Sequence, residues 1–291
     1  MNYKVYQKGK RVPDGQAITL LREESAGIFE SMRAYGGRIL HEEEHLARLL
    51  ESAKTVGYQP APSAPSLKKS LSLALRASAE KNTSVRLTLF EGKTFVILGV
   101  RECPAELYKT GVALKTASFP RGSGNAFPYQ AKASAYQQAV LASTEPNPGK
   151  AFDWLFLDQG NYLTETRTAN IFIVHHRFTS QGRETAEAVL LTPPEHLILN
   201  GVTRRFVIKC ALALGFQVRE VPLTRHEFFN ADEAFLSNTS WEVLPVRELD
   251  GRVIGEGKPG PVTLKLHRFF KRRVQHDVTS HCSPRTHKRL R

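Results

Sequence analysis

Cysteine is scarce in this 291-residue chain, and the three residues present, Cys103, Cys210 and Cys282, are widely dispersed. An odd number without paired spacing argues against a disulfide framework or a zinc site and favours a reducing compartment. No stretch approaches the roughly 20 apolar residues of a membrane-spanning helix. The opening segment MNYKVYQKGKRVPDG has no hydrophobic signal core. The sequence therefore predicts a cytoplasmic protein without a membrane partner or a bound metal.

Acidic residues are nearly absent from the end of the chain. From Lys258 onward, one acid, Asp277, stands against ten lysines and arginines, which places +9 of the formal net charge of +13 in this segment. Such a segment can bind polyanions nonspecifically, so a noncatalytic polyanion-binding protein is one alternative. It lacks the interleaved aromatics and glycines of a single-strand binding surface. We therefore expect residues 275–291 to form a basic, disordered tail, and we expect no nucleic-acid partner.

The length favours two domains of unequal size. Before residue 118, alternating apolar patterns and turn residues predict hairpins at 4–12, 26–40 and 85–101, and helical spacing predicts helices at 41–57 and 66–81. Prolines and glycines interrupt both periodicities at 119–130. Strands are then expected at 153–166, 170–176, 188–193, 216–223, 231–249 and 251–255, with helices at 200–215 and 260–274. Interspersed helices and hairpins favour an α+β class, with a small domain at 1–118, a linker at 119–130 and a large domain at 131–274.

A lysine, Lys132, stands at the head of the apolar run FPYQAKASAYQQAVLAS. A lysine in an enclosed apolar pocket has a lowered pKa and can form a Schiff base, whereas an ordinary first-turn lysine is solvated. In DWLFLDQGNYLTETRTANIFIV, Glu165 and Asn170 interrupt apolar surroundings. A carboxylate there either faces water from an edge strand or is buried with a partner.

Two polar turns are candidate anion sites. Residues 200–203, NGVT, open a predicted helix, whose free N–H groups favour a phosphate or carboxylate. Residues 237–241, SNTSW, form a turn rich in hydroxyls and amides. Arg48 lies off the apolar stripe of its helix, so periodicity predicts a solvated side chain unless another element covers that face. A lysine, an anion site and an acid are together the requirements of pyridoxal 5'-phosphate.

Eight collinear blocks between about residues 3 and 270 carry a family resemblance: GIFESMRAYGG, HLARLLESA, AKASAY, LTETRTANIF, LLTP, NGVTRRFVI, ADEAFLSNTSWEVLPV and VIGEGKPGPVT. In these blocks the chain resembles the class IV, fold-type IV pyridoxal-phosphate enzymes. That group includes branched-chain aminotransferases, D-amino-acid transaminases and aminodeoxychorismate lyases. The resemblance implies a small α/β domain, a larger barrel-like domain with the cofactor between them, and a homodimer.

The resemblance also implies roles for particular residues. Lys132 would bind the cofactor covalently and move the substrate proton, and Glu165 would pair with the pyridine nitrogen. Matches to phosphate-binding positions are Arg48, Val202, Thr203 and Thr239, and Tyr136 would approach the phenolic oxygen. Matches to positions on the substrate side are Phe29, Ser31, Arg86 and Ser240.

The choice among activities depends on a few positions. Ser31 stands where branched-chain enzymes commonly have glycine and the other two groups have threonine. Glu91 stands where D-amino-acid transaminases and the lyases tend to carry an arginine. The segments YGG, NGVTRRFVIK and GEGKPGPVT are most similar to the branched-chain group. We expect ping-pong transfer of an amino group between an L-amino acid, with a branched-chain donor favoured, and 2-oxoglutarate. The alternative is an aminodeoxychorismate lyase that releases pyruvate and 4-aminobenzoate.

Overall fold

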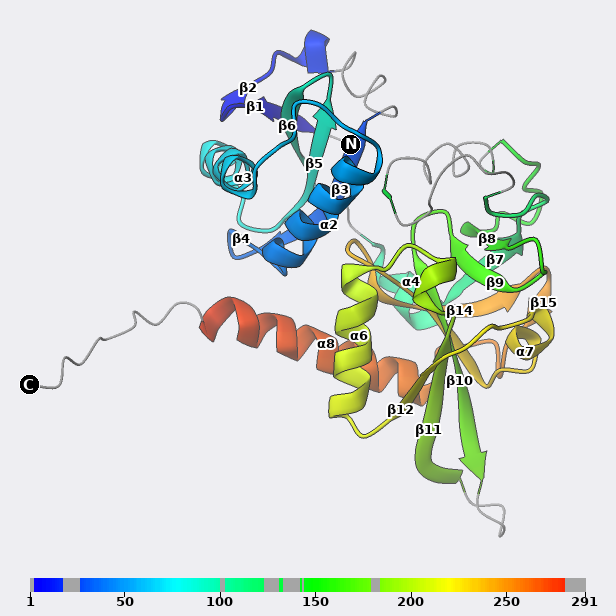
Figure 1. Ribbon diagram of the computed structural model, residues 1–291. Coiled ribbons are helices and arrows are strands. Elements are labelled where there is room, and N and C mark those ends of the chain that lie inside the picture. The colour runs from blue at the N-terminus through cyan, green and yellow to red at the C-terminus, as the bar shows by residue number, and fades with distance from the viewer. Residues whose placement is uncertain are drawn as a thin grey trace, which may run out of the picture.

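The computed structural model describes residues 3–17, 27–99, 103–122, 131–132, 142, 144–178 and 184–280. For residues 177–178, 184–187 and 280 it describes the backbone alone. The described chain forms two sheets, each with its own helices and its own buried apolar core, and Figure 1 shows them as two lobes.

The first sheet has six antiparallel strands in the order β2-β1-β6-β5-β3-β4. Their bounds are β1 (Lys4–Gln7), β2 (Lys10–Arg11), β3 (Ile28–Tyr35), β4 (Arg38–Ile39), β5 (Thr83–Phe90) and β6 (Lys93–Gly99). Buried and partly exposed residues alternate along all of β3. Because side chains of a strand point alternately to its two faces, Ile28, Glu30 and Met32 share the covered face, and Phe29 and Ser31 share the other.

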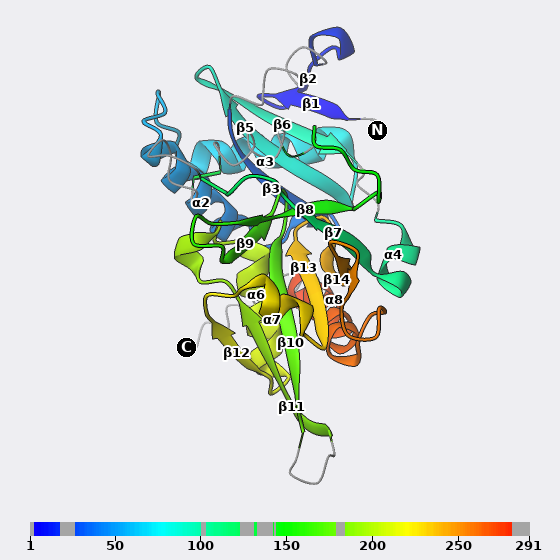
Figure 2. The ribbon, with the colours of Figure 1, turned by 90° about the vertical axis from the view of Figure 1, so that its right-hand side faces the viewer.

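Two helices, α2 (Glu42–Thr55) and α3 (Ala64–Ser78), cover that face of the first sheet (Figures 1 and 2). Leu46 and Leu49 of α2 pack with Leu67 and Leu71 of α3 and with the sheet in one core. The Ser63 hydroxyl accepts a hydrogen bond from the Ser66 N–H and so caps the start of α3. This packing fixes α2 directly above β3, which decides what its inward side chains meet.

The second sheet has nine strands in the order β12-β11-β10-β13-β14-β7-β8-β9, with β15 on β14. Their bounds are β7 (Val112–Thr116), β8 (Asp153–Leu157), β9 (Leu163–Thr166), β10 (Asn170–Phe178), β11 (Glu184–Thr192), β12 (Gln217–Glu220), β13 (Glu233–Asn238), β14 (Glu242–Leu249) and β15 (Arg252–Val253). An additional pairing joins β9 to β10 at Glu165 and Asn170, so β10-β13-β14-β7-β8-β9 closes on itself like a barrel. The expected α+β fold with a barrel-like domain is confirmed.

Helices α6 (Val202–Ala213) and α8 (Pro261–Ser280) pack against the outside of this sheet, where Phe206 and Phe270 share a core with Phe172 and Phe235. Figure 1 shows the two helices crossing. Other short helical segments are α4 (Ala105–Thr110), η2 (Glu195–Leu197) and α7 (Arg225–Phe229).

The boundaries differ from those expected in two places. Strand β7 precedes the expected linker yet pairs with β14 and β8 of the second sheet, because Val112 and Leu114 pack in the core of that sheet. Helix α8 continues to Ser280 and therefore includes residues 275–280, the first part of the expected tail. Residues 281–291 lie outside the described residues. Neither α4 nor α7 was expected from the sequence, since both are too short for a clear helical period.

Candidate active site

Ten of the eleven candidate residues line one cavity between the two sheets. They are Phe29, Ser31, Arg48, Arg86, Lys132, Glu165, Val202, Thr203, Thr239 and Ser240. The eleventh, Tyr136, lies outside the described residues. Residues more than 200 positions apart in sequence therefore meet at one place, as the resemblance implies.

Lys132 lies in the wall of this cavity, with only 15% of its side chain exposed. Its Nζ lies 3.7 Å from Glu30 Oε2 and 5.3 Å from the centre of the Phe29 ring. Its backbone N–H donates to Ser52 Oγ on α2 at 3.3 Å. Burial lowers the pKa of the Lys132 ammonium to about 8, against the opposing effect of Glu30. The solvated alternative is therefore wrong, and a neutral amine is accessible near physiological pH.

Glu165 is also buried, at the point where β9 meets β10. Oε2 accepts from Asn170 Nδ2 at 2.6 Å, and Oε1 accepts from the Leu199 N–H at 3.0 Å. Arg121 forms a close ion pair with Oε1. Burial raises the pKa of the Glu165 carboxyl, and the Arg121 cation opposes this effect. The alternative in which Glu165 faces water is wrong, because the closed barrel leaves no open edge at β9.

The start of α6 is a cradle of hydrogen-bond donors. Gly201 is the N-cap residue and supplies no side chain to the first turn, so the N–H groups near Val202 and Thr203 have no side-chain cap. Thr203 Oγ1 lies 3.3 Å from Thr239 Oγ1, and Thr239 also donates to the Ser31 carbonyl at 3.1 Å. A side chain at position 201 would collide with Asn170, since an added Cβ would lie 2.1 Å from Asn170 Oδ1.

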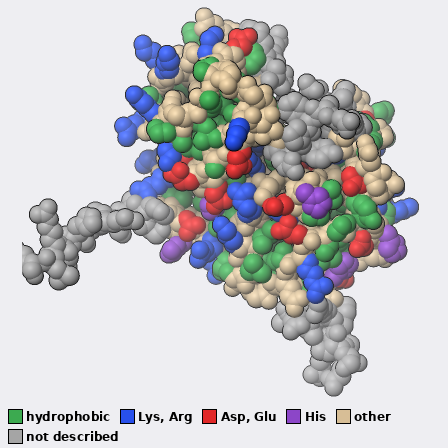
Figure 3. Space-filling view, viewed as in Figure 1, with side chains coloured by type: hydrophobic (Ala, Val, Ile, Leu, Met, Phe, Trp, Pro, Cys, Tyr) green, Lys and Arg blue, Asp and Glu red, His purple; other side chains and the backbone are tan. Residues whose placement is uncertain are grey.

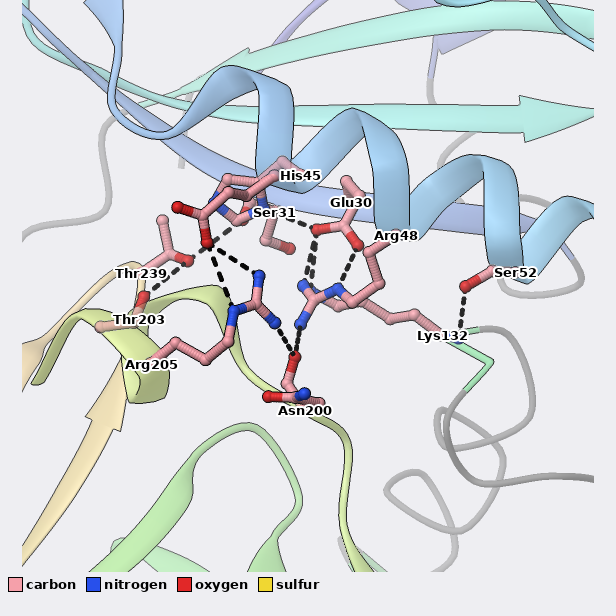
Figure 4. Close-up of polar contacts among 11 residues, drawn as sticks. Glu30, Ser31, His45, Arg48, Ser52, Lys132, Asn200, Thr203, Arg205 and Thr239 are labelled. Atoms are coloured by element: carbon pink, nitrogen blue, oxygen red, sulfur yellow. Dashed lines mark hydrogen bonds and ion pairs between the residues drawn. The ribbon is translucent and has the colours of Figure 1, made fainter. Parts of the chain in front are cut away.

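Arg48 lies on α2 and completes this cradle from the opposite side (Figure 4). Its Nε and Nη2 donate to the two oxygens of Glu30 at 2.7 Å each, and Nη1 donates to the Asn200 carbonyl at 2.8 Å. Since a guanidinium has five N–H donors, one remains on each terminal nitrogen. The solvated arginine predicted by periodicity is wrong, because β3 and the loop before α6 cover that face of α2.

Arg86 and Phe29 form the wall nearest the first sheet. The Arg86 guanidinium carbon lies 3.9 Å from the centre of the Phe29 ring. The two residues come from neighbouring strands, with Phe29 of β3 opposite Thr88 and Ser31 opposite Arg86 of β5. Ser240 follows Thr239 in the loop between β13 and β14 and lines the same cavity. This wall offers one cation, one aromatic face and two hydroxyls.

The charge of the cavity is strongly asymmetric. Among the described lining residues, the cations are Arg48, Arg86, Arg121, Lys132 and Arg167, whereas Glu165 is the one carboxylate. Such a wall favours anionic ligands.

Glu30, His45 and Arg121 are among the residues with contacts at the site that were not expected from the sequence. Glu30 did carry a signal, because an acid occupies a core-facing position in the alternating pattern of β3. His45 is similarly buried beside Leu46 on α2. Arg121 carries none, since it follows a proline in a segment without periodicity.

The donors fit pyridoxal 5'-phosphate. One cavity contains an accessible amine, a buried carboxylate and a cradle of N–H, hydroxyl and guanidinium donors. The aldehyde of that cofactor requires the amine, its ring nitrogen requires the carboxylate, and its phosphate requires the donors. Together with the closed barrel, the site agrees with what the resemblance to class IV pyridoxal-phosphate enzymes implies.

The comparison with protein families agrees. The family model described as "Amino-transferase class IV" matches residues 27–249, so the chain belongs to this family. Enzymes of this family depend on pyridoxal phosphate.

Curated relatives and solved structures carry branched-chain names. The chain is 32% identical to the branched-chain-amino-acid aminotransferase of Pseudomonas aeruginosa, over 89% of this chain and 88% of that protein. It is 31% identical to branched-chain-amino-acid aminotransferase-like protein 1 of Arabidopsis thaliana over 84% of this chain, but spans 45% of that longer protein. A crystal structure of the branched-chain aminotransferase from the archaeon Thermoproteus uzoniensis with norvaline superposes with a TM-score of 0.76 at 29% identity, covering 92% of this chain and 93% of that chain.

The distribution of charge on the surface is relevant to the alternative of a polyanion-binding protein. Figure 3 shows acidic and basic side chains interspersed on the face where α2 meets α6. There Glu44 pairs with Arg205 at 2.9 Å and with Lys209 at 3.7 Å. On this face the basic residues are therefore partly neutralised. No helix among the described residues has the length and apolar character to cross a membrane.

Proposed function

We propose that this chain is a pyridoxal-phosphate aminotransferase that moves an amino group from an L-amino acid, with a branched-chain donor favoured, to 2-oxoglutarate. The observation that carries the proposal is the meeting of Lys132, Glu165 and the α6 cradle in one cavity. The names of the curated relatives support the choice of donor. The proposed enzyme acts in the cytoplasm as a homodimer.

The proposed roles follow from the contacts. Lys132 would hold the cofactor aldehyde through its amine and, when that amine is free, would take the proton from the substrate α-carbon. Its lowered pKa suits this work, because a general base is most effective when its pKa lies near the working pH. When bound, the cofactor would supply a ring that accepts electrons as that proton leaves.

The two polar ends of the cavity hold the cofactor in this proposal. Glu165 supplies a carboxylate to the ring nitrogen, with its orientation fixed by Asn170 and the Leu199 N–H. Arg48, Thr203, Thr239 and the first turn of α6 supply donors to the phosphate. Tyr136 stays a prediction from the resemblance as the residue beside the phenolic oxygen.

The remaining wall is the proposed substrate side. Arg86 offers a cation for a substrate carboxylate, and Phe29 offers an aromatic face for an apolar side chain. A cavity with a net excess of cations suits a dianionic keto acid such as 2-oxoglutarate. In this proposal Ser31 and Ser240, which line the same cavity, hydrogen-bond the substrate.

A spectral titration tests the proposal. The purified protein with bound cofactor is titrated with L-leucine, L-glutamate, D-alanine and an aromatic amino donor without any keto acid, and the absorbance of the bound cofactor is followed. We expect L-leucine to convert the aldehyde form to the pyridoxamine form, and 2-oxoglutarate to restore it. Conversion by D-alanine alone would contradict the L-amino-acid assignment. If L-leucine does not convert the bound cofactor, and the protein releases pyruvate when it is given aminodeoxychorismate, the lyase would be favoured.

A further inference from the structure

A second carboxylate lies directly behind the cavity wall. Glu30 is fully buried on the core-facing side of β3, beneath α2. Figure 4 shows it between His45 and Arg48, with Lys132 approaching from the adjacent segment. A carboxylate in a core among Ile28 and Met32 is costly unless cations and donors surround it. The negative charge of Glu30 at this buried position therefore needs an explanation.

The first contact fixes an arginine. Both Glu30 oxygens accept from Arg48, at 2.7 Å each, in the two-pronged geometry that sets the plane of a guanidinium. The Asn200 carbonyl holds the third donor at 2.8 Å. These three bonds leave Arg48 one N–H on each terminal nitrogen, and Arg48 lines the cavity.

The second contact concerns Lys132. Its Nζ lies 3.7 Å from Glu30 Oε2, and the other charged groups that act on it are Arg48, Arg86 and Glu165. The His45 Nδ1 lies 2.8 Å from Glu30 Oε2. Burial lowers the pKa of His45 to about 4, so the ring is neutral at pH 7 and donates a hydrogen bond without adding charge. Glu30 thus offsets two cations, Arg48 and Lys132, with one carboxylate.

We propose that Glu30 is a positioning residue with two effects: it orients Arg48 toward the cofactor phosphate, and it stabilises the charged form of the Lys132 amine. The inference rests on the proposed function, because both effects concern the cofactor. Glu30 acts through its neighbours, since it lies behind the cavity wall rather than among the described lining residues.

The first effect is tested with cofactors that differ in one group. Full-length protein is stripped of cofactor and titrated with pyridoxal 5'-phosphate and with pyridoxal, which lacks the phosphate. In Glu30→Gln we expect affinity for the phosphorylated form to fall by about 10-fold or more, since a charged hydrogen-bond donor is misplaced, and affinity for pyridoxal to fall far less.

The second effect is tested by pH. Only the neutral amine attacks an aldehyde, so the rate of pyridoxal addition to the stripped protein rises with pH, with a midpoint that follows the pKa of Lys132. Loss of the Glu30 charge destabilises the ammonium, so in Glu30→Gln we expect the midpoint to fall by about one unit or more. Circular dichroism and a thermal melt establish that the variant is folded.

Two further variants keep the test decisive. Glu43→Gln removes a carboxylate of α2 that pairs with Lys68 away from the cavity, and should change neither measurement. Glu30→Asp, which serves if Glu30→Gln does not fold, should keep the midpoint near that of the wild type while losing part of the preference for phosphate. The inference would be overturned if a folded Glu30→Gln kept the wild-type values of both the phosphate preference and the midpoint. It would also be overturned if Glu30→Asp lowered the midpoint and left the phosphate preference intact. A wild-type protein that binds neither aldehyde would instead overturn the proposed function.

Discussion

The two ends of the cavity each contain a buried pair of one arginine and one glutamate, but the glutamate lines the cavity at only one of them. At the phosphate end, Arg48 lines the cavity and Glu30 lies behind it. At the other end, Glu165 lines the cavity with Arg121 beside it. The same two residue types thus present a cation where a phosphate is expected and an anion where a ring nitrogen is expected.

The two carboxylates also differ in their balance of burial and donors. The pKa of Glu30 is lowered well below its usual range, because Arg48, Lys132 and the His45 hydrogen bond together outweigh a large burial effect. The pKa of Glu165 is raised, because burial outweighs Arg121 and the Leu199 N–H. The donor set, rather than the residue type, therefore decides how firmly a buried carboxylate keeps its charge.

Removal of the Lys132 amine should have the largest effect. In Lys132→Ala we expect turnover to fall by about 10⁴-fold, the upper end of what a general base contributes, because cofactor attachment is lost as well. Borohydride reduction followed by intact-mass analysis should show a covalent cofactor adduct in the wild type and none in the variant. Wild-type turnover in Lys132→Ala would contradict the assignment of the amine.

A double-mutant cycle then separates stability from activity at the ring end. Glu165→Gln leaves the buried Arg121 unpaired, so we expect it to cost about 3–5 kcal/mol of unfolding free energy. Glu165→Gln with Arg121→Gln should recover most of that loss in urea denaturation, while the activity stays low because the carboxylate is still missing. Recovery of activity together with stability would show that Glu165 acts only as a structural partner of Arg121.

The histidine at the phosphate end gives a smaller effect that depends on pH. The pKa of His45 is about 4 in the folded protein, below its ordinary value near 6.5. Between these two pH values the unfolded chain binds a proton at this histidine and the folded chain does not. The contribution of His45 to the free energy of unfolding is therefore fully present above pH 6.5 and declines as pH falls toward 4. We expect a contribution of about 1.4 kcal/mol per pH unit in that window.

Urea unfolding at pH 7, 6 and 5 measures this slope. In His45→Gln the slope should be shallower by that amount, because glutamine does not titrate. Equal slopes in the wild type and His45→Gln would show that His45 does not contribute.

Most of the fold could be predicted because its elements carry local signals. The hairpin of β5 and β6 follows an alternating apolar pattern, and α6 follows an Asn-Gly entry and a helical period. The helices α4 and α7 could not be predicted in this way, because five or six residues are too few to show a period. The membership of β7 in the second sheet also carries no local signal, since it depends on pairing with β14, which lies more than 100 residues later.

The sequence by itself determined the local elements, the class IV resemblance and the candidate residues, of which the ten that the structure describes meet in one cavity. Tertiary structure decided the surroundings of those residues. Arg48 is off the apolar stripe of its own helix, yet it is buried because β3 and the loop before α6 cover it. Glu30 and Arg121 became part of the site in the same way. Periodicity records how an element faces its own core, whereas burial and pKa depend on which distant element lies opposite, and only the packed chain fixes that.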